Sequence, residues 1–282
     1  MRKIAIINQK GGVGKTTSSV NLSAALATAG QRVMLIDLDP QAHATLHLGL
    51  APSPSEPSMY HVLTDETSLA EARCQVAPNL CVAGSHIDLA AAEVELAGVV
   101  GRELILRDKL AADEDQFDYM LIDCPPSLGV LTINALAAVD EVFIPVQPHF
   151  LALHGLSKLL ETISLVGRRL NPQLRITGII FCLHEAGTRL AAEVTSDLEA
   201  FFEQPRHAAK PWGTARPFQT RIRRNIRLAE APSFGQSIFD YAPDSHGATD
   251  YQQLAEEVLG HGVAGHAVAG HGVASHAANE RG

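Results

Sequence analysis

The segment "NQKGGVGKTT", residues 8–17, directly follows the apolar run 4–7. An apolar strand that ends in a glycine-rich loop and continues into a helix is the setting of a phosphate-binding loop. The backbone N–H groups of residues 11–15 would line an anion-binding nest at the start of that helix. Lys15 would neutralise the terminal phosphates of a nucleotide, and the Thr16 hydroxyl would ligate Mg²⁺. The predicted nucleotide contacts of the loop are Gly11, Gly12, Val13, Gly14, Lys15, Thr16 and Thr17.

The loop also departs from the usual pattern. A phosphate-binding loop has a glycine five positions before its last glycine, and here that position is Gln9. The next residue is a second lysine, Lys10. Since Lys15 already supplies the cation that one nucleotide needs, the additional charge calls for another explanation.

Short apolar runs alternate along the chain with longer segments of helical period. We predict strands over 3–8, 32–37, 80–83, 119–123, 141–146 and 176–183, and helices over 16–29, 89–111, 131–138, 153–170 and 190–202. This alternation favours an α/β fold of the P-loop NTPase type, with a mostly parallel central sheet and helices on both faces. Ligands of such sheets bind at the carboxyl ends of the strands.

Acidic residues stand at the ends of two of these strands. "VMLIDLDPQ" (33–41) carries Asp37 and Asp39, and "FDYMLIDCPPS" (117–127) carries Asp123. An aspartate at the tip of an apolar strand beside a phosphate-binding loop is the metal-positioning group of nucleotide hydrolases, whereas an isolated one simply caps a turn. We predict a Mg²⁺ site made of Thr16, Asp37 and Asp123.

The motifs "KGGVGKTT", "DLDPQ" and "DCPPSLG" together resemble the ParA family of P-loop ATPases, within the class that includes MinD. The resemblance continues through 143–163 and 224–259, and thus covers nearly all of the chain except 203–220 and the tail. It implies an ATPase that uses ATP with Mg²⁺ and forms a homodimer when ATP is bound.

The resemblance also gives residues their roles. It implies that Lys10 reaches the phosphates bound by the other subunit, and that Asp39 positions the attacking water, so that the catalytic set is Lys10, Lys15 and Asp39. It further implies that Arg224 and Asn225 lie near the adenine. The family usually has proline where Arg223 stands, which leaves that base-contacting role open.

The chain is acidic, with a net charge of -9, yet residues 221–227, "RIRRNIR", form a dense basic run. Such a run is either a solvated helix face or a patch that binds DNA phosphates without reading sequence. The resemblance to ParA supports DNA binding and extends it to Arg189, next to the start of the predicted helix 190–202. The predicted DNA-binding residues are Arg189, Arg221, Arg224 and Arg227.

The resemblance implies an ATP-dependent switch that positions a chromosome, a plasmid or another large cargo, with hydrolysis stimulated by a ParB-like partner. Four alternatives have their own requirements, and one of them, a DNA-binding module without enzymatic activity, would leave the three aspartates and Thr16 without a role. A MinD-type membrane ATPase needs a C-terminal amphipathic helix, and the tail lacks that pattern. An iron–sulfur protein of this class needs bridging cysteines, for which Cys124 is the candidate. A biosynthetic P-loop enzyme needs a substrate pocket that no motif marks.

The composition indicates the domain organisation and the location of the protein in the cell. Of 282 residues, 46% are hydrophobic and 19% charged, which is typical of a globular chain. We expect one P-loop ATPase domain over 1–260 and an unstructured Gly/Ala/His-rich tail over 261–282. The four cysteines form no C-x-x-C pair, and no signal peptide or apolar run of membrane-spanning length is present in the sequence. A cytoplasmic, nucleoid-associated protein without membrane binding is expected.

Overall fold

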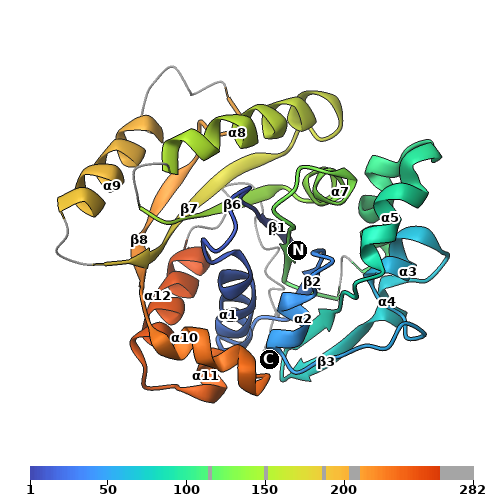
Figure 1. The fold of residues 1–282 in the computed structure, drawn as a ribbon, viewed down its shortest axis with the longest axis horizontal. Coiled ribbons are helices and arrows are strands. Elements are labelled where there is room, and N and C mark those ends of the chain that lie inside the picture. Colours follow the sequence, from blue (N-terminus) through green and yellow to red (C-terminus); the bar gives the residue numbers. More distant parts are fainter. Residues whose placement is uncertain (114–115, 149–151, 186–188, 203–209, 261–282) are drawn as a thin grey trace, which may run out of the picture.

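The structure, a computed structural model, describes residues 1–113, 116–148, 152–185, 189–202 and 210–260. Its centre is an eight-stranded sheet of order β3-β4-β2-β5-β1-β6-β7-β8 (Figure 1). Every neighbouring pair is parallel except β3 and β4, which are antiparallel. The strands are β1 (Arg2–Ile6), β2 (Val33–Asp37), β3 (Arg73–Ala77), β4 (Leu80–Ala83), β5 (Tyr119–Asp123), β6 (Glu141–Val146), β7 (Arg175–His184) and β8 (Arg216–Arg223).

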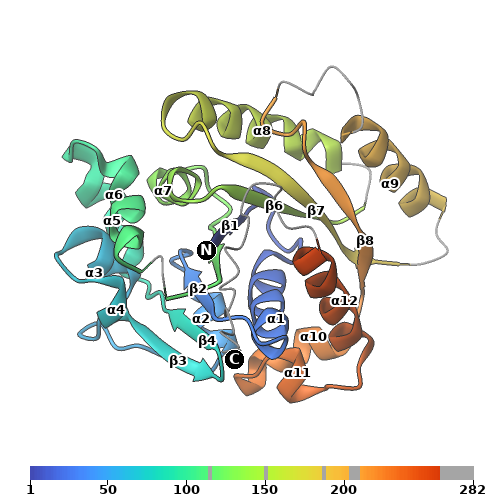
Figure 2. The same cartoon turned by 180° about the vertical axis from the view of Figure 1, so that it is seen from behind.

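Helices cover both faces of this sheet (Figures 1 and 2). On one face lie α1 (Lys15–Thr28), α2 (His43–His47), α10 (Ile226–Glu230), η5 (Ala231–Phe234), α11 (Ile238–Tyr241) and α12 (His246–Gly260). On the other lie α3 (Met59–Thr64), α4 (Leu69–Ala72), α5 (Leu89–Glu95), η1 (Leu96–Gly98), η2 (Arg102–Leu104), α6 (Ile105–Leu110), η3 (Ala111–Asp113), α7 (Val130–Ala138), α8 (Ala152–Arg169) and α9 (Arg189–Phe202). Among the described residues, no helix is both long and apolar enough to cross a membrane.

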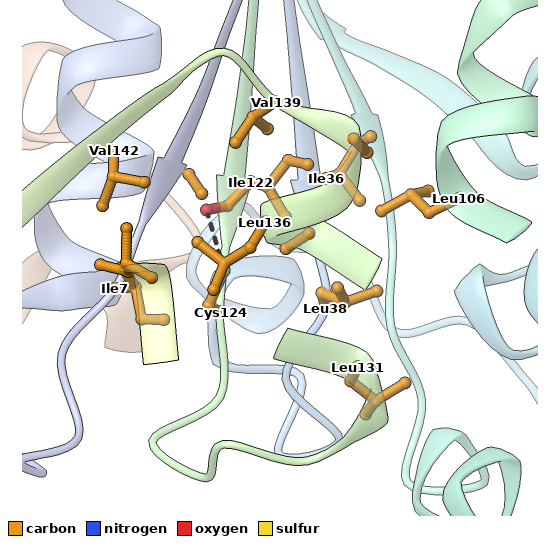
Figure 3. Packing of buried hydrophobic residues seen from close by; sticks show 14 of the residues in the cluster. Ile7, Ile36, Leu38, Leu106, Ile122, Cys124, Leu131, Leu136, Val139 and Val142 are labelled. Atoms are coloured by element: carbon orange, nitrogen blue, oxygen red, sulfur yellow. Dashed lines mark hydrogen bonds between the residues drawn. The ribbon is translucent and has the colours of Figure 1, made fainter. Parts of the chain in front are cut away.

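The two faces have separate apolar cores, because successive side chains of a strand point to opposite faces. In β1, Ile4 and Ile6 pack with α1 and α12, whereas Ala5 packs on the other side. Figure 3 shows part of this second core, in which Ile122 of β5 and Leu136 of α7 lie close together. Burial on both faces explains why the central strands are continuous apolar runs rather than alternating ones.

The predicted α/β architecture is confirmed. All six predicted strands form, and their ends agree with the prediction to within two residues. The predicted helices at 16–29, 131–138, 153–170 and 190–202 also form, again with small shifts at their ends.

The structure differs from the sequence-based expectations in three places. The continuous helix expected over 89–111 is broken between η1 and η2, where Gly101 adopts a left-handed φ of 77°. The edge strand β3 was missed because its half-exposed, polar-rich sequence lacks a long apolar run. Part of the stretch 203–220 belongs to β8, which also carries Arg221 and Arg223; these two arginines therefore lie on a strand and not on a helix face. The predicted tail at 261–282 lies outside the described residues.

Candidate nucleotide site

The phosphate-binding loop connects β1 to α1 at the carboxyl end of the sheet. Gly12 and Gly14 have left-handed φ values of 70° and 94°, which glycine adopts without steric cost. Gly14 is the N-cap of α1, and its carbonyl accepts the N–H of Ser18 at 2.9 Å. A side chain at Gly14 would also come within 3.3 Å of Cys182 on β7. The loop is thus shaped for backbone N–H groups to point at an anion from the start of a helix.

The two lysines of the loop face different surroundings. Lys15 is 8% exposed, and its Nζ donates to the carbonyl of Lys10 at 3.1 Å. Burial lowers the pKa of Lys15, and the charges of Asp123 and Asp39 oppose that shift. Lys10 is exposed, and its own N–H is held by Asn8 Oδ1 at 3.0 Å. One loop therefore presents one cation inside the site and another at the surface.

The strand register brings the two metal-site aspartates together. Asp37 and Asp123 are the last residues of β2 and β5, and they are paired across the two strands. The end of β1, Ile6, is paired with Asp123 on its other side. Both carboxyl groups are fully buried, and burial raises the pKa of each; the charge of Asp37 raises the pKa of Asp123 further.

Two hydroxyl groups of α1 hold Asp123. Thr16 Oγ1 donates to Asp123 Oδ2 at 2.8 Å, and Ser19 Oγ donates to Asp123 Oδ1 at 2.8 Å. Residues 16 and 19 are three positions apart and therefore share one face of the helix. Ser19 was not predicted as a site residue, although its spacing from Thr16 is a signal that the sequence contains.

Asp37 is held in a similar way by α2. The backbone N–H and the hydroxyl of Thr45 both donate to Asp37 Oδ2, at 2.8 and 2.7 Å. The other oxygen accepts the N–H of Asp39 at 3.1 Å. Asp39 is 8% exposed, and its Oδ1 accepts the N–H of Gln41 at 2.9 Å, which fixes the orientation of this carboxylate. Thr45 was also missed, because no residue spacing in the sequence points from it to Asp37.

The donor set fits Mg²⁺. One hydroxyl and two buried carboxyl groups with raised pKa values would be stabilised by a nearby divalent cation, and oxygen ligands suit this ion. Within the described residues, no group of three or more His, Cys, Asp or Glu side chains is arranged to hold a metal by itself. Nucleotide phosphates would complete the coordination, as is usual for Mg²⁺.

Cys124 follows Asp123 but does not suit a bridging cluster. Its side chain is fully buried in the core of Figure 3, where its thiol donates to the carbonyl of Ile122 at 3.8 Å. Burial raises the pKa of this thiol well above its usual value. A cluster ligand needs an accessible thiolate, so these surroundings oppose the iron–sulfur alternative.

Three of the predicted DNA-binding arginines lie beside the edge strand of the sheet: Arg221 near the carboxyl end of β8, Arg224 just after it and Arg227 on α10. Arg224 and Arg227 have exposed side chains and pair with Glu185 and Glu230 at 2.6 and 2.8 Å. Arg221 is less exposed; it pairs with Glu199 at 2.7 Å and lies 4.5 Å from the centre of the Phe181 ring.

Two positions beside these arginines have structural partners of their own. Arg223, which departs from the family pattern, makes a two-pronged ion pair with the buried carboxylate of Asp250. Asn225 is the N-cap of α10, where its Oδ1 accepts the N–H of Arg227 at 2.9 Å. Arg189 is the first residue of α9, and its side chain is outside the described part of the structure.

Known proteins share this chain's sequence and fold. A family model described as an AAA domain matches residues 1–176. The chain is 45% identical to the sporulation initiation inhibitor protein Soj of Bacillus subtilis, over 92% of this chain and 98% of that protein. It is 44% identical to the chromosome-partitioning ATPase Soj of Thermus thermophilus, over 92% of this chain and 96% of the other. The chain belongs to the ParA/Soj family of partitioning ATPases.

This membership confirms the predicted family and the predicted enzyme class, an ATPase. A solved structure with the same fold is described as cobyrinic acid a,c-diamide synthase from Mycobacterium smegmatis, with an ATP analogue and magnesium bound. It has a TM-score of 0.78 and 34% identity, and the alignment covers 93% of this chain and 95% of that one. The predicted cofactors of the ParA/Soj chain, ATP and Mg²⁺, agree with that complex.

Proposed function

We propose that this partitioning ATPase is a DNA-binding switch, which dimerises with ATP, binds DNA without sequence preference, and releases it after hydrolysis. The observation that carries the proposal is the contrast between the two lysines of the phosphate-binding loop. Lys15 is buried beside the aspartates, whereas Lys10 is exposed on the same loop. Two nucleotides that face each other across a dimer need cations from both subunits, and Lys10 is placed to supply one.

In the proposed reaction, Lys15 neutralises the terminal phosphates, and Thr16 with Asp123 and Asp37 would hold Mg²⁺. The ion, when bound, offsets charge on the phosphate oxygens. Asp39 orients the attacking water. Its carboxylate is fixed by the N–H of Gln41, and it lies close enough for its charge to act on both Asp37 and Lys15. Positioning and charge stabilisation predominate in such reactions, so hydrolysis is slow until a ParB-like partner stimulates it.

Arg224 and Arg227 are the proposed principal DNA contacts, assisted by Arg189 and Arg221. Both principal arginines are about half exposed or more and pair with exposed or half-exposed glutamates. Such surface ion pairs contribute little to stability, so DNA phosphates can replace the glutamates at small cost. Dimerisation would double the number of phosphate contacts and confine strong binding to the ATP state. The protein would then be nucleoid-bound in the cytoplasm when it holds ATP.

The decisive experiment measures DNA binding by fluorescence anisotropy with no nucleotide, with ADP and with a slowly hydrolysed ATP analogue, over a salt series. Binding only with the ATP analogue, weakening steeply with salt, is expected. Arg224→Glu should weaken it, whereas the matched variant Arg107→Glu should not, because Arg107 is exposed on α6 across the sheet. Equal binding in all three nucleotide states would contradict the switch, and equal binding by both variants would remove the arginine patch from it.

Asp39→Ala tests the role of the water-positioning residue. We expect this variant to bind ATP with unchanged affinity, to hydrolyse it at least about 100-fold more slowly, and to accumulate as a dimer. Light scattering and a phosphate-release assay provide the two readouts. A variant that hydrolyses ATP at the wild-type rate would show that another group orients the water.

A biosynthetic ATPase is the second candidate, because the chain is 34% identical to the structure described as a diamide synthase. The higher identity of the partitioning relatives, 44 and 45%, favours the switch. Product analysis separates the two functions. ATP turnover that yields only ADP and free phosphate with purified protein and DNA supports the switch, whereas turnover that requires a small-molecule acceptor supports biosynthesis.

A further inference from the structure

The segment 37–49 connects the metal-site carboxylate Asp37 to the face of the molecule that carries the arginines. Within this segment, Thr45 of α2 is fully buried and donates both its N–H and its hydroxyl to Asp37 Oδ2. The same hydroxyl accepts the N–H of Ser85, at the end of β4, at 2.8 Å. Thr45 therefore joins the ends of two strands to one short helix, and it cannot move without disturbing Asp37.

The other end of the segment packs against the turn that follows η5. Gly49 and Gly235 both have left-handed φ values, 73° and 66°. A Cβ added to Gly235 would lie 2.8 Å from the Cα of Gly49, and one added to Gly49 would lie 3.2 Å from the carbonyl of Gly235. The buried ring of His47, which belongs to the same segment, also lies close to the backbone of Gln236. Two backbones thus meet here with no room for a side chain.

The backbone that leads from Asp39 into α2 is strained. Ala42, the N-cap of α2, has a φ of 53°, in the left-handed region that residues with a Cβ disfavour. Its N–H donates to the carbonyl of Asp39 at 2.9 Å, so the strained residue is tied to the proposed water-positioning aspartate. A segment held in an unfavourable conformation by its neighbours rearranges readily when one of those neighbours changes.

We propose that α2 couples the nucleotide site to the arginine segment, with Thr45 as the positioning residue for Asp37 and the Gly49–Gly235 contact as the point of transmission. The coupling rests on the proposed function, in which nucleotide state controls DNA binding by Arg224 and Arg227. A nucleotide that re-orients Asp37 displaces Thr45, and α2 then moves η5 and α10, on which Arg227 lies. Because binding free energies are reciprocal, DNA bound at α10 should also favour the ATP-bound arrangement of Asp37.

Backbone hydrogen exchange without DNA tests the coupling apart from the DNA-binding function. In the wild type, an ATP analogue should slow exchange over both α2 and residues 226–241. Gly235→Ala should keep the nucleotide affinity within about twofold and lose the change over 226–241. Gly30→Ala is the matched control: Gly30 also has a left-handed φ, 84°, but no atom lies within 4 Å of an added Cβ. If both variants keep the wild-type response, the glycine contact transmits nothing.

Thr45 provides a second test if Gly235→Ala does not fold. Thr45→Val keeps the shape of the side chain and removes the donor to Asp37, whereas Thr45→Ser restores the hydroxyl. The valine variant should lose about tenfold of the ATP-dependent gain in DNA affinity and the exchange response over 226–241, and serine should restore both. Equal behaviour of the two variants would overturn the proposal. If Arg224→Glu leaves DNA affinity unchanged while the exchange response persists, the DNA-binding proposal fails and the coupling stands.

Discussion

Two regions of the molecule are rich in charge: the phosphate-binding edge, with Lys15, Asp37 and Asp123, and the arginine segment, residues 221–227. Their charges are arranged differently. At the phosphate-binding edge, Asp37 and Asp123 are buried side by side and held by hydroxyl and amide donors, and burial raises the pKa of each. Lys15 beside them is itself disfavoured as a cation by burial. The buried charges of this region would be balanced by a bound nucleotide and a metal ion.

In the arginine segment, by contrast, the described arginines pair with carboxylates of the chain itself. Arg221, Arg223, Arg224 and Arg227 pair with Glu199, Asp250, Glu185 and Glu230. The charges of this region are therefore compensated without a ligand, and under the proposed function DNA phosphates would bind here by replacing these carboxylates. The comparison indicates that a site with buried, uncompensated charges favours a charged ligand strongly, whereas a surface whose charges are already paired favours one only weakly.

The largest effect should come from removing the buried cation. Lys15→Ala should weaken nucleotide binding at least about 100-fold, because the buried cation that would neutralise the phosphates is lost. Lys10→Ala is the control on the same loop: binding to one subunit should persist, and dimer formation with ATP should be lost. Isothermal titration and light scattering measure the two effects. Equal loss of nucleotide affinity in both variants would refute the division of labour between the lysines.

A smaller effect separates the arginines from one another. Arg223→Ala should lower the free energy of unfolding by about 2 kcal/mol, because the buried carboxylate of Asp250 loses its cationic partner and keeps only the backbone N–H of residue 223. Arg227→Ala should leave stability almost unchanged, because its pair with Glu230 is exposed. Urea unfolding of the two variants checks this order. Similar stabilities would mean that the Arg223 pair is as weak as a surface pair.

Much of the fold and of the phosphate-binding edge could be predicted from the sequence, because their signals are local. A strand, a glycine loop and a helix are contiguous, and an aspartate at a strand tip lies next to the run that places it. Parallel pairing then brings Asp37 and Asp123 together without further information. The partners of these carboxylates were harder: Ser19 has a local signal in its spacing from Thr16, but Thr45 reaches Asp37 through a left-handed turn at Ala42 that no pattern predicts.

The arginine segment shows the opposite case. The density of charge in 221–227 was evident, but what each charge does depends on distant residues. Arg223 meets Asp250 on α12, and Arg221 meets Glu199 on α9. Whether an arginine is available to DNA is decided by such long-range pairs, and a single sequence does not contain them. The strand β8 was likewise obscured because its pairing partner, β7, precedes it by a helix and a long connection.

The smallest effect lies at the junction of the two regions, where His47 joins α2 to the turn after η5. Its ring is 2% exposed, and burial lowers its pKa to about 4, from 6.5. The unfolded chain therefore binds a proton at this position more readily than the native one. The contribution is absent above pH 6.5 and grows as the pH falls from 6.5 towards 4, where it destabilises the native state by up to about 1.4 kcal/mol per pH unit.

His47→Asn isolates this contribution, because asparagine keeps a polar side chain at this position but does not titrate. Between pH 6.5 and 5.5 the wild type should lose about 1 kcal/mol more stability than this variant. The raised pKa values of Asp37 and Asp123 act in the opposite direction and cancel in the comparison, since both proteins contain them. His43→Asn, exposed on the same helix, is the control and should follow the wild type. If His47→Asn also follows the wild type, protons reach His47 in the native state, and the junction between the two regions is open rather than closed.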